Sequence, residues 1–184
     1  MQIESQEFLP IVEQAGALCF FDIECTGTHG DYNSVLVVSV KPYHKRPVSF
    51  VVERAGDDRR VVRAARDELS KYLVWVSYFG SGFDVPLLQS RLLRHRANRL
   101  EKKHHIDMYY HLNSRVLTSR RSQAHRLEWL ESPQHKMTLS AELWNKVLSN
   151  PRALRIMLAR CESDCRGLEW LYDRTKHLII NVTK

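Results

Sequence analysis

Two acidic residues interrupt the most hydrophobic segment of the chain. Residues 17–23 read ALCFFDI, a continuous apolar run of strand length except for Asp22, and Glu24 follows almost at once. A short apolar run of this kind is typical of a central strand that is buried on both faces of a sheet. Because side chains alternate between the two faces of a strand, Asp22 and Glu24 project to the same side. The chain must therefore bury this strand and still stabilise two neighbouring carboxylates.

The hydrophobic pattern elsewhere predicts an α/β domain. Further apolar runs of strand length predict strands at residues 34–40, 48–53 and 73–78. Apolar residues at helical spacing predict helices at residues 4–15, from residue 57, from Asp84 as an N-cap, and from Pro151 to about Leu178. Residues 105–110 fit either a short strand or the start of a helix, and residues 111–150 fit helices and loops. A mixed sheet flanked by helices is the expected architecture, and 184 residues suit a single domain over residues 1–184.

Basic residues outnumber acidic ones by 28 to 21, which gives a net charge of +7. They concentrate in two stretches, residues 91–105 and 115–126. A field of one sign attracts polyanions and favours phosphate contacts, although a solvated helix face explains such a stretch equally well. The residues that we predict to bind nucleic acid from these stretches are Arg91, Arg94, Arg96, Arg99, Lys102, Arg120 and Arg121.

The sequence favours an intracellular protein that is not bound to a membrane. No apolar run approaches the roughly 18 to 20 residues that a membrane span requires, and the first residues carry acids rather than a basic signal-peptide region. The cysteines form no CxxC pair, so we expect reduced thiols packed in the core rather than disulfides or a zinc site. These cysteines are Cys19, Cys25, Cys161 and Cys165.

Two further acids lie where burial is expected. Asp84 follows Phe83 at a strand-to-helix junction, and Asp164 lies on the apolar stripe of the last predicted helix. Taken singly, each acid has an ordinary structural explanation, such as a helix cap for Asp84 or a salt bridge for Asp164. Taken together, four carboxylates in one cleft predict a site for Mg²⁺ or Mn²⁺, which prefer oxygen ligands. Two such ions assist phosphodiester hydrolysis.

The wording of these segments resembles the exonuclease motifs of the DEDD superfamily, which has a ribonuclease H-like fold. The segments FFDIECTG, YFGSGFDVPLL, HHIDMYYHL and DCRGLEWLY are most similar to ribonuclease H-like exonucleases related to the proofreading domains of family-B DNA polymerases. The resemblance covers about residues 18–178. It implies that Asp22, Glu24, Asp84 and Asp164 are catalytic residues that hold two divalent cations, Mg²⁺ or Mn²⁺.

The resemblance also suggests supporting residues. Asp107 matches an Ile-Asp of the subgroup and has either a supporting role near the site or a buried structural hydrogen bond. Thr26 and Gly27 lie where the first motif approaches the terminal nucleotide, and Phe83 or Leu88 would wedge against a base, with plain packing as the alternative.

The chain departs from its relatives at the expected general base. Relatives have Tyr four residues before the last aspartate or His five residues before it, whereas this chain has Arg160 and Ala159. Arg160 could instead bind the scissile or a terminal phosphate. A histidine such as His105, from the group His104, His105 and His111, could replace the missing base. Relatives also often have Asn in the turn where this chain has Phe79.

These features favour a metal-dependent 3′-to-5′ exonuclease that acts on single-stranded or frayed nucleic acid, with DNA favoured over RNA. The alternatives are a weakly active or inactive nucleic-acid-binding relative, and an endonuclease or RNA-specific nuclease of the same fold. The expected partners are DNA or RNA 3′ ends, and the sequence names no protein partner. We expect a cytoplasmic or nucleoid-associated protein that suits DNA replication, repair or degradation, including a phage-encoded protein in the host cytoplasm.

Overall fold

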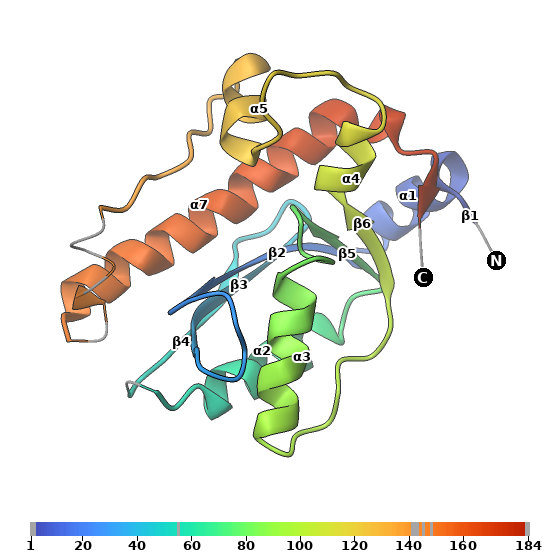
Figure 1. Ribbon diagram of the computed structural model, residues 1–184. Helices are drawn as coiled ribbons and strands as arrows, with labels where there is room; N and C mark the ends of the chain where they lie inside the picture. The colour runs from blue at the N-terminus through green and yellow to red at the C-terminus, as the bar shows by residue number, and fades with distance from the viewer. Residues whose placement is uncertain (1–2, 55, 141–143, 145, 148, 183–184) are drawn as a thin grey trace.

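The computed structural model describes residues 3–54, 56–140, 144, 146–147 and 149–182 (Figure 1). Its main sheet has five strands in the order β4-β3-β2-β5-β6. These strands are β2 (Leu18–Cys25), β3 (Val35–Pro42), β4 (Val48–Val51), β5 (Val74–Ser77) and β6 (His104–Asp107). The pairs β2-β3 and β3-β4 are antiparallel, whereas β2-β5 and β5-β6 are parallel. The sheet is therefore mixed, as the sequence predicts.

Helices cover the two faces of this sheet (Figure 1). They are α1 (Ser5–Gln14), α2 (Arg59–Leu69), α3 (Asp84–Arg94), α4 (Met108–Asn113), α5 (Gln123–Trp129), α7 (Pro151–Thr175) and the 3₁₀ helix η1 (Lys176–Leu178). A second, two-stranded sheet pairs β1 (Ile3–Glu4) with β7 (Asn181–Val182). No described helix is long and apolar enough to cross a membrane.

Alternate residues of β2 enter two different cores. Phe21 packs on Trp75 and joins the core that contains the apolar faces of α2 and α3. Phe20 packs on Tyr172 and joins the core formed with the C-terminal part of α7. Because neighbouring side chains of a strand point in opposite directions, both faces of β2 are buried. This explains why its sequence is a continuous apolar run.

Asp22 is the exception in this strand. It is half-buried, whereas every other residue of β2 is buried. The pairing of β2 with β3 shifts register between Glu24 and Cys25, directly after the two acids. Such bulges often occur beside active sites because they change the direction of side chains.

The predicted elements are confirmed among the described residues, with one local correction; residues 141–143, 145 and 148 of the predicted helix-and-loop segment 111–150 lie outside the described residues. Residues 104–113 form both proposed elements, strand β6 followed by α4. Asp84 is wrong as an N-cap, because Phe83 holds that position and makes no side-chain capping bond. Asp84 is instead the first helical residue. The four cysteines are free and buried, as expected.

Candidate active site

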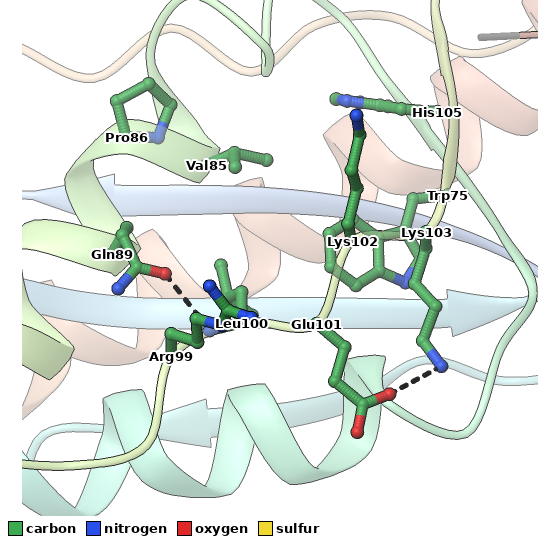
Figure 2. A pocket seen from close by; sticks show the side chains of 10 residues that line it. All are labelled: Trp75, Val85, Pro86, Gln89, Arg99, Leu100, Glu101, Lys102, Lys103 and His105. Carbon is green, nitrogen blue, oxygen red and sulfur yellow. Dashed lines mark hydrogen bonds and ion pairs between the residues drawn. The ribbon is translucent and has the colours of Figure 1, made fainter. Parts of the chain in front are cut away.

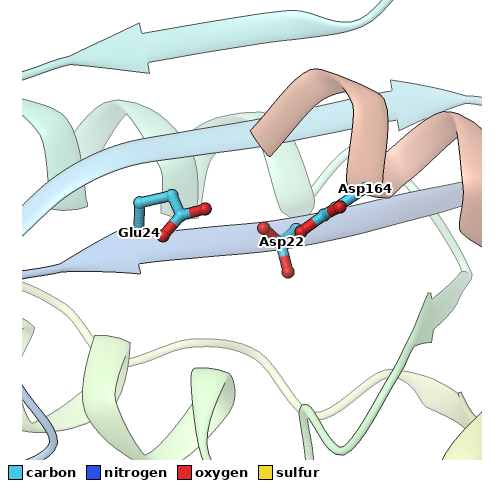
Figure 3. Close-up of side chains that lie close together, drawn as sticks. All are labelled: Asp22, Glu24 and Asp164. Atoms are coloured by element: carbon cyan, nitrogen blue, oxygen red, sulfur yellow. The ribbon is translucent and has the colours of Figure 1, made fainter. Parts of the chain in front are cut away.

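Three of the predicted acids meet at one point between β2 and α7. Asp22 and Glu24 come from β2, and Asp164 comes from the middle of α7, which crosses that strand (Figure 3). One carboxylate oxygen from each lies within 4.8 Å of the others. Asp164 reaches this point because its helix packs its apolar stripe on β2 and β3, where the Cys161 thiol donates to the Asp22 carbonyl at 3.3 Å.

Two cations lie against these acids. The Nζ atom of Lys136 is 2.9 Å from Oδ2 of Asp164. The Nε atom of Arg160 is 3.3 Å from Oε1 of Glu24 and 3.8 Å from Oδ2 of Asp164. Burial alone would lower the pKa of Lys136, but the charges of Asp164 and Asp22 raise it above its ordinary value. Lys136 therefore stays positively charged beside the acids.

The carboxylate oxygens of these three acids are suitable ligands for a divalent cation. Glu24 is 5% exposed, yet its Oε1 atom has no hydrogen-bond partner among the described residues. The neighbouring Nε of Arg160 likewise lacks a hydrogen bond within the described part of the chain. The two atoms face each other as an ion pair at 3.3 Å, and a buried charged atom that makes no hydrogen bond is costly. Three carboxylates with an unsatisfied oxygen are the hard ligands that Mg²⁺ and Mn²⁺ prefer.

The environment favours the protonated form of Asp22, Glu24 and Asp84 when no cation is bound. Burial, followed by the charge of Asp164, raises the pKa of Asp22 to about 7. Burial, followed by the charge of Asp22, raises the pKa of Glu24 to about 8. The pKa of Asp84 is also raised, by burial first and then by Asp22 and Asp107. Clustered carboxylates of this kind are typical of functional sites.

These shifts predict that the metal-free protein loses stability as the pH rises. Asp22 and Glu24 bind protons more tightly in the folded chain, so their contribution is complete below about pH 4 and is lost as the pH rises through about 7 and 8. We expect the free energy of unfolding in EDTA to fall by several kcal/mol from pH 5 to pH 8 relative to the Asp22→Asn/Glu24→Gln variant, because each pH unit between an ordinary and a raised pKa corresponds to about 1.4 kcal/mol. Urea unfolding of both proteins measures this difference.

The comparison with that variant also isolates the carboxylates from the histidines. Burial lowers the pKa of His105 and of His111, so their contribution changes in the opposite direction, with stability rising as they lose protons. Both histidines are unchanged in the variant. A pH-independent difference between the two proteins would contradict the prediction.

Asp84 joins the site from the turn between β5 and α3. It is 6% exposed, and its pKa responds to the charge of Asp22. A Cβ atom on Gly80 would lie 3.4 Å from Oδ2 of Asp84, so the turn backbone approaches this carboxylate closely. Asp84 is not part of the group of three oxygens within 4.8 Å. It therefore lies beside the cluster rather than inside it.

Asp107 fixes the shape of this turn. Its carboxylate accepts hydrogen bonds from the backbone N–H groups of Phe79 at 2.8 Å and Ser81 at 2.9 Å, and from the Ser81 hydroxyl at 2.5 Å. It also accepts from Tyr109 N–H at the start of α4. The two suggested roles of Asp107 thus coincide, because its structural bonds hold the turn that carries Asp84.

His105, the suggested replacement for the missing base, lies on the α3 side of the sheet. Nε2 of His105 is 2.7 Å from the Ser77 hydroxyl, which in turn accepts from Gly80 N–H. The ring of His105 contacts Phe21 and Trp75, whose side chains lie on the α3 side of the sheet. The charges that act most strongly on Asp22 and Glu24 are those of Asp164 and of Asp22 itself, followed by the cations Lys136 and Arg160, and no histidine is among them. His105 is thus placed to support the turn.

The two basic stretches contain one buried and several exposed members of the predicted nucleic-acid-binding set. Arg91 is a correction to the predicted nucleic-acid-binding set, because it is 3% exposed and donates two hydrogen bonds of 2.8 Å to Asp58. The exposed members of the set are Arg94, Arg96, Arg99, Lys102, Arg120 and Arg121. Arg99 and Lys102 line a pocket of about 560 Å³ with Trp75 and His105, on the α3 side of the sheet (Figure 2). They are therefore separated from the cluster of Asp22 and Asp164.

A second pocket lies between the loop after β2 and α3. Its volume is about 620 Å³, and Phe83 and Arg94 are among its lining residues. In this same loop, the hydroxyl of Thr26 accepts a hydrogen bond from Ser34 N–H at 3.0 Å, and a Cβ atom on Gly27 would lie 2.6 Å from the Asn33 side chain. Thr26 and Gly27 thus shape the loop, and Phe83 lines the pocket beside it.

Lys136 is the residue of the site that the sequence does not indicate. It lies in a segment without helical or strand periodicity, between α5 and α7. Among the described lysines, its closeness to Asp164 and Asp22 sets it apart.

Comparisons with known proteins identify the superfamily and a similar fold. Residues 19–176 match the RNase H superfamily, so the chain belongs to that superfamily. The fold is similar to that of a family B DNA polymerase from the hyperthermophilic archaeon Pyrobaculum calidifontis, with a TM-score of 0.68 and 22% sequence identity. The similarity covers 86% of this chain and 24% of the polymerase chain. No curated protein sequence matches the chain. Membership of the superfamily supports a nuclease function that uses divalent cations.

Proposed function

We propose that this protein is a two-metal-ion 3′-to-5′ exonuclease that acts on single-stranded or frayed nucleic acid, with DNA favoured over RNA. The observation that carries the proposal is the convergence of Asp22, Glu24 and Asp164 within 4.8 Å, with the buried carboxylate of Asp84 beside Asp22. The resemblance of the chain's motifs to proofreading exonucleases supports the direction of cleavage.

The four carboxylates would hold Mg²⁺ or Mn²⁺. Bound there, such ions supply a Lewis acid and lower the pKa of a bound water, which is the chemistry that phosphodiester hydrolysis requires. Lys136 and Arg160 pair with the carboxylates in the metal-free chain, and their charges suit the oxygens of the scissile phosphate once those carboxylates bind cations. Asp107 holds the turn that precedes Asp84.

A weakly active nucleic-acid-binding relative is the second candidate. Its support is Arg160, which occupies the position of the usual tyrosine and pairs with Glu24 and Asp164. A guanidinium stays protonated, so it does not accept a proton from water.

End-labelled oligonucleotides separate these candidates. DNA and RNA with 3′ or 5′ overhangs are incubated with Mg²⁺, Mn²⁺ or EDTA. The exonuclease proposal expects a metal-dependent ladder that shortens from the 3′ end. Binding without cleavage under every metal condition would support the second candidate, and a single internal cut would indicate an endonuclease.

Lys136 provides a further test of the same site. We expect Lys136→Met to lower the cleavage rate by about 100-fold, because one lost charge at a reacting phosphate typically costs this much, and to leave single-strand binding nearly unchanged. The matched control is Lys71→Met, which removes an exposed lysine paired with Glu68 on α2. Cleavage by Lys136→Met at the wild-type rate would show that Lys136 only neutralises the empty acidic cluster.

A further inference from the structure

Four aromatic side chains form a partly exposed cluster beside the candidate active site. Tyr78, Phe79, Tyr109 and Tyr110 are called the aromatic platform below. Phe79 is 41% exposed and Tyr110 is 50% exposed. The rings of Phe79 and Tyr110 lie 6.0 Å apart with their planes tilted by 35°, and Tyr109 contacts both. Exposed large apolar rings in a group often mark an interaction site.

Phe79 has an unfavourable backbone conformation. Its φ angle is +65°, in the left-handed region, where a bulky residue is an outlier. Its N–H group is held by Asp107, and its ring lies so close to Gly82 that a Cβ atom there would be 2.7 Å from its Cζ. Backbone strain in a folded chain often marks a functional position. Folding alone does not explain an exposed phenylalanine here, since glycine or asparagine adopts this conformation more easily.

The platform borders both the acids and a group of positive charges. Phe79 directly precedes Gly80, whose backbone approaches the carboxylate of Asp84. On the other side, the Tyr78 hydroxyl donates to the backbone carbonyl of Arg121, an exposed residue that follows exposed Arg120. The guanidinium of Arg126 lies 6.0 Å from the centre of the Tyr78 ring. An occupant with flat apolar faces and negative charges fits these surroundings.

We propose that the aromatic platform stacks unpaired nucleobases of the strand whose end enters the acidic cluster. This inference rests on the proposed function for the identity of the strand, but binding at the platform requires no cleavage. Aromatic rings stack on every base, whereas a paired base has its faces covered by its neighbours. The platform therefore selects single-stranded substrate without selecting its sequence.

The experiment compares normal and abasic strands. Fluorescein-labelled dT12 and a strand of the same length with abasic sites in place of thymines are titrated in EDTA against wild-type protein and the Phe79→Asn variant. We expect Phe79→Asn to weaken binding of dT12 by about 5- to 100-fold, the usual range for loss of one stacked base, and to leave binding of the abasic strand unchanged. The same variant should unfold at a higher temperature, because asparagine tolerates a positive φ angle.

Two further variants complete the test. Tyr110→Ser, which alters the platform without changing the turn, should show the same base-dependent loss. Trp129→Asn, which removes a 52% exposed aromatic side chain of α5, should show none. The proposal would be refuted if the wild-type protein bound dT12 and the abasic strand with equal affinity. It would also be refuted if Phe79→Asn weakened binding of both strands equally. Base-dependent binding without any nuclease activity would instead refute the exonuclease proposal and retain the platform.

Discussion

The Asp22→Asn variant should cleave nucleic acid at least about 1,000-fold more slowly than the wild-type protein. Asp22 is at the centre of the cluster, where it acts electrostatically on Glu24 and Asp84. Bound cations typically supply several kcal/mol of transition-state stabilisation, and about 4 kcal/mol corresponds to this factor. An amide keeps the shape of the side chain but removes the charge that holds the ion.

The same substitution should stabilise the metal-free protein. Burial and the charge of Asp164 raise the pKa of Asp22 to about 7, so its ionised form is unfavourable at pH 8. Removing that charge should raise the melting temperature in EDTA by about 4 °C, which corresponds to about 1 to 2 kcal/mol for a chain of this size. Adding Mn²⁺ should stabilise the wild-type protein more than the variant.

Cleavage assays and thermal unfolding test both effects. Asp67→Asn is the matched control, because Asp67 is 66% exposed on α2 and its removal should alter neither property. A variant that is inactive and also less stable than the wild type in EDTA would mean that Asp22 has a structural role. A fully active Asp22→Asn variant would refute the metal site.

The candidate catalytic acids are predictable because regular structure fixes where their side chains point. The two-residue period of a strand places Asp22 and Glu24 on one face, and the helical period places Asp164 on the apolar stripe of α7. An acid at a buried position is conspicuous in a sequence because burial of a charge is costly. The apolar runs indicate where the strands lie in the sequence, but they do not specify the order of the strands in the sheet, because pairing depends on contacts between distant residues.

Periodicity does not predict the position of Lys136 or the aromatic platform. Lys136 meets Asp164 through a segment with no repeating pattern, and Phe79, in the turn after β5, meets Tyr110 of α4. Neither contact follows from periodicity. The backbone conformation of Phe79 is also invisible in the sequence, because phenylalanine is a poor choice for a positive φ angle. Such exceptions to local rules are expected at functional sites.

Arg91 and Arg94 show why a basic stretch does not identify its own binding residues. The two arginines are three positions apart on α3, yet Arg91 is buried and Arg94 is exposed. Arg91 pairs with Asp58, which is fully buried and also accepts hydrogen bonds from His95 and from Val35 N–H. Burial alone would raise the pKa of Asp58, but the hydrogen bonds from Arg91 and His95 lower it.

Removing one partner of this buried pair should be strongly destabilising. We expect Arg91→Met to lower the free energy of unfolding by about 3 to 5 kcal/mol, because it leaves the carboxylate of Asp58 buried without its main counter-charge. Adding Asp58→Asn to this variant should recover part of the loss, since the remaining group is then neutral. Urea unfolding at pH 7 measures both changes. An Arg91→Met variant as stable as the wild type would show that the pair is dispensable.

Arg94→Met is the matched control on the same helix. Its removal should change the free energy of unfolding by less than about 0.5 kcal/mol, as is usual at exposed positions. If Arg94 contacts a phosphate, the salt dependence of single-strand binding should become shallower by about one ion, whereas Arg91→Met should leave that slope unchanged in the folded protein. A shallower slope in Arg91→Met would return Arg91 to the binding surface. Arg91 is thus expected to stabilise the fold and Arg94 to bind the substrate, because Asp58 is placed to pair with Arg91 and not with Arg94.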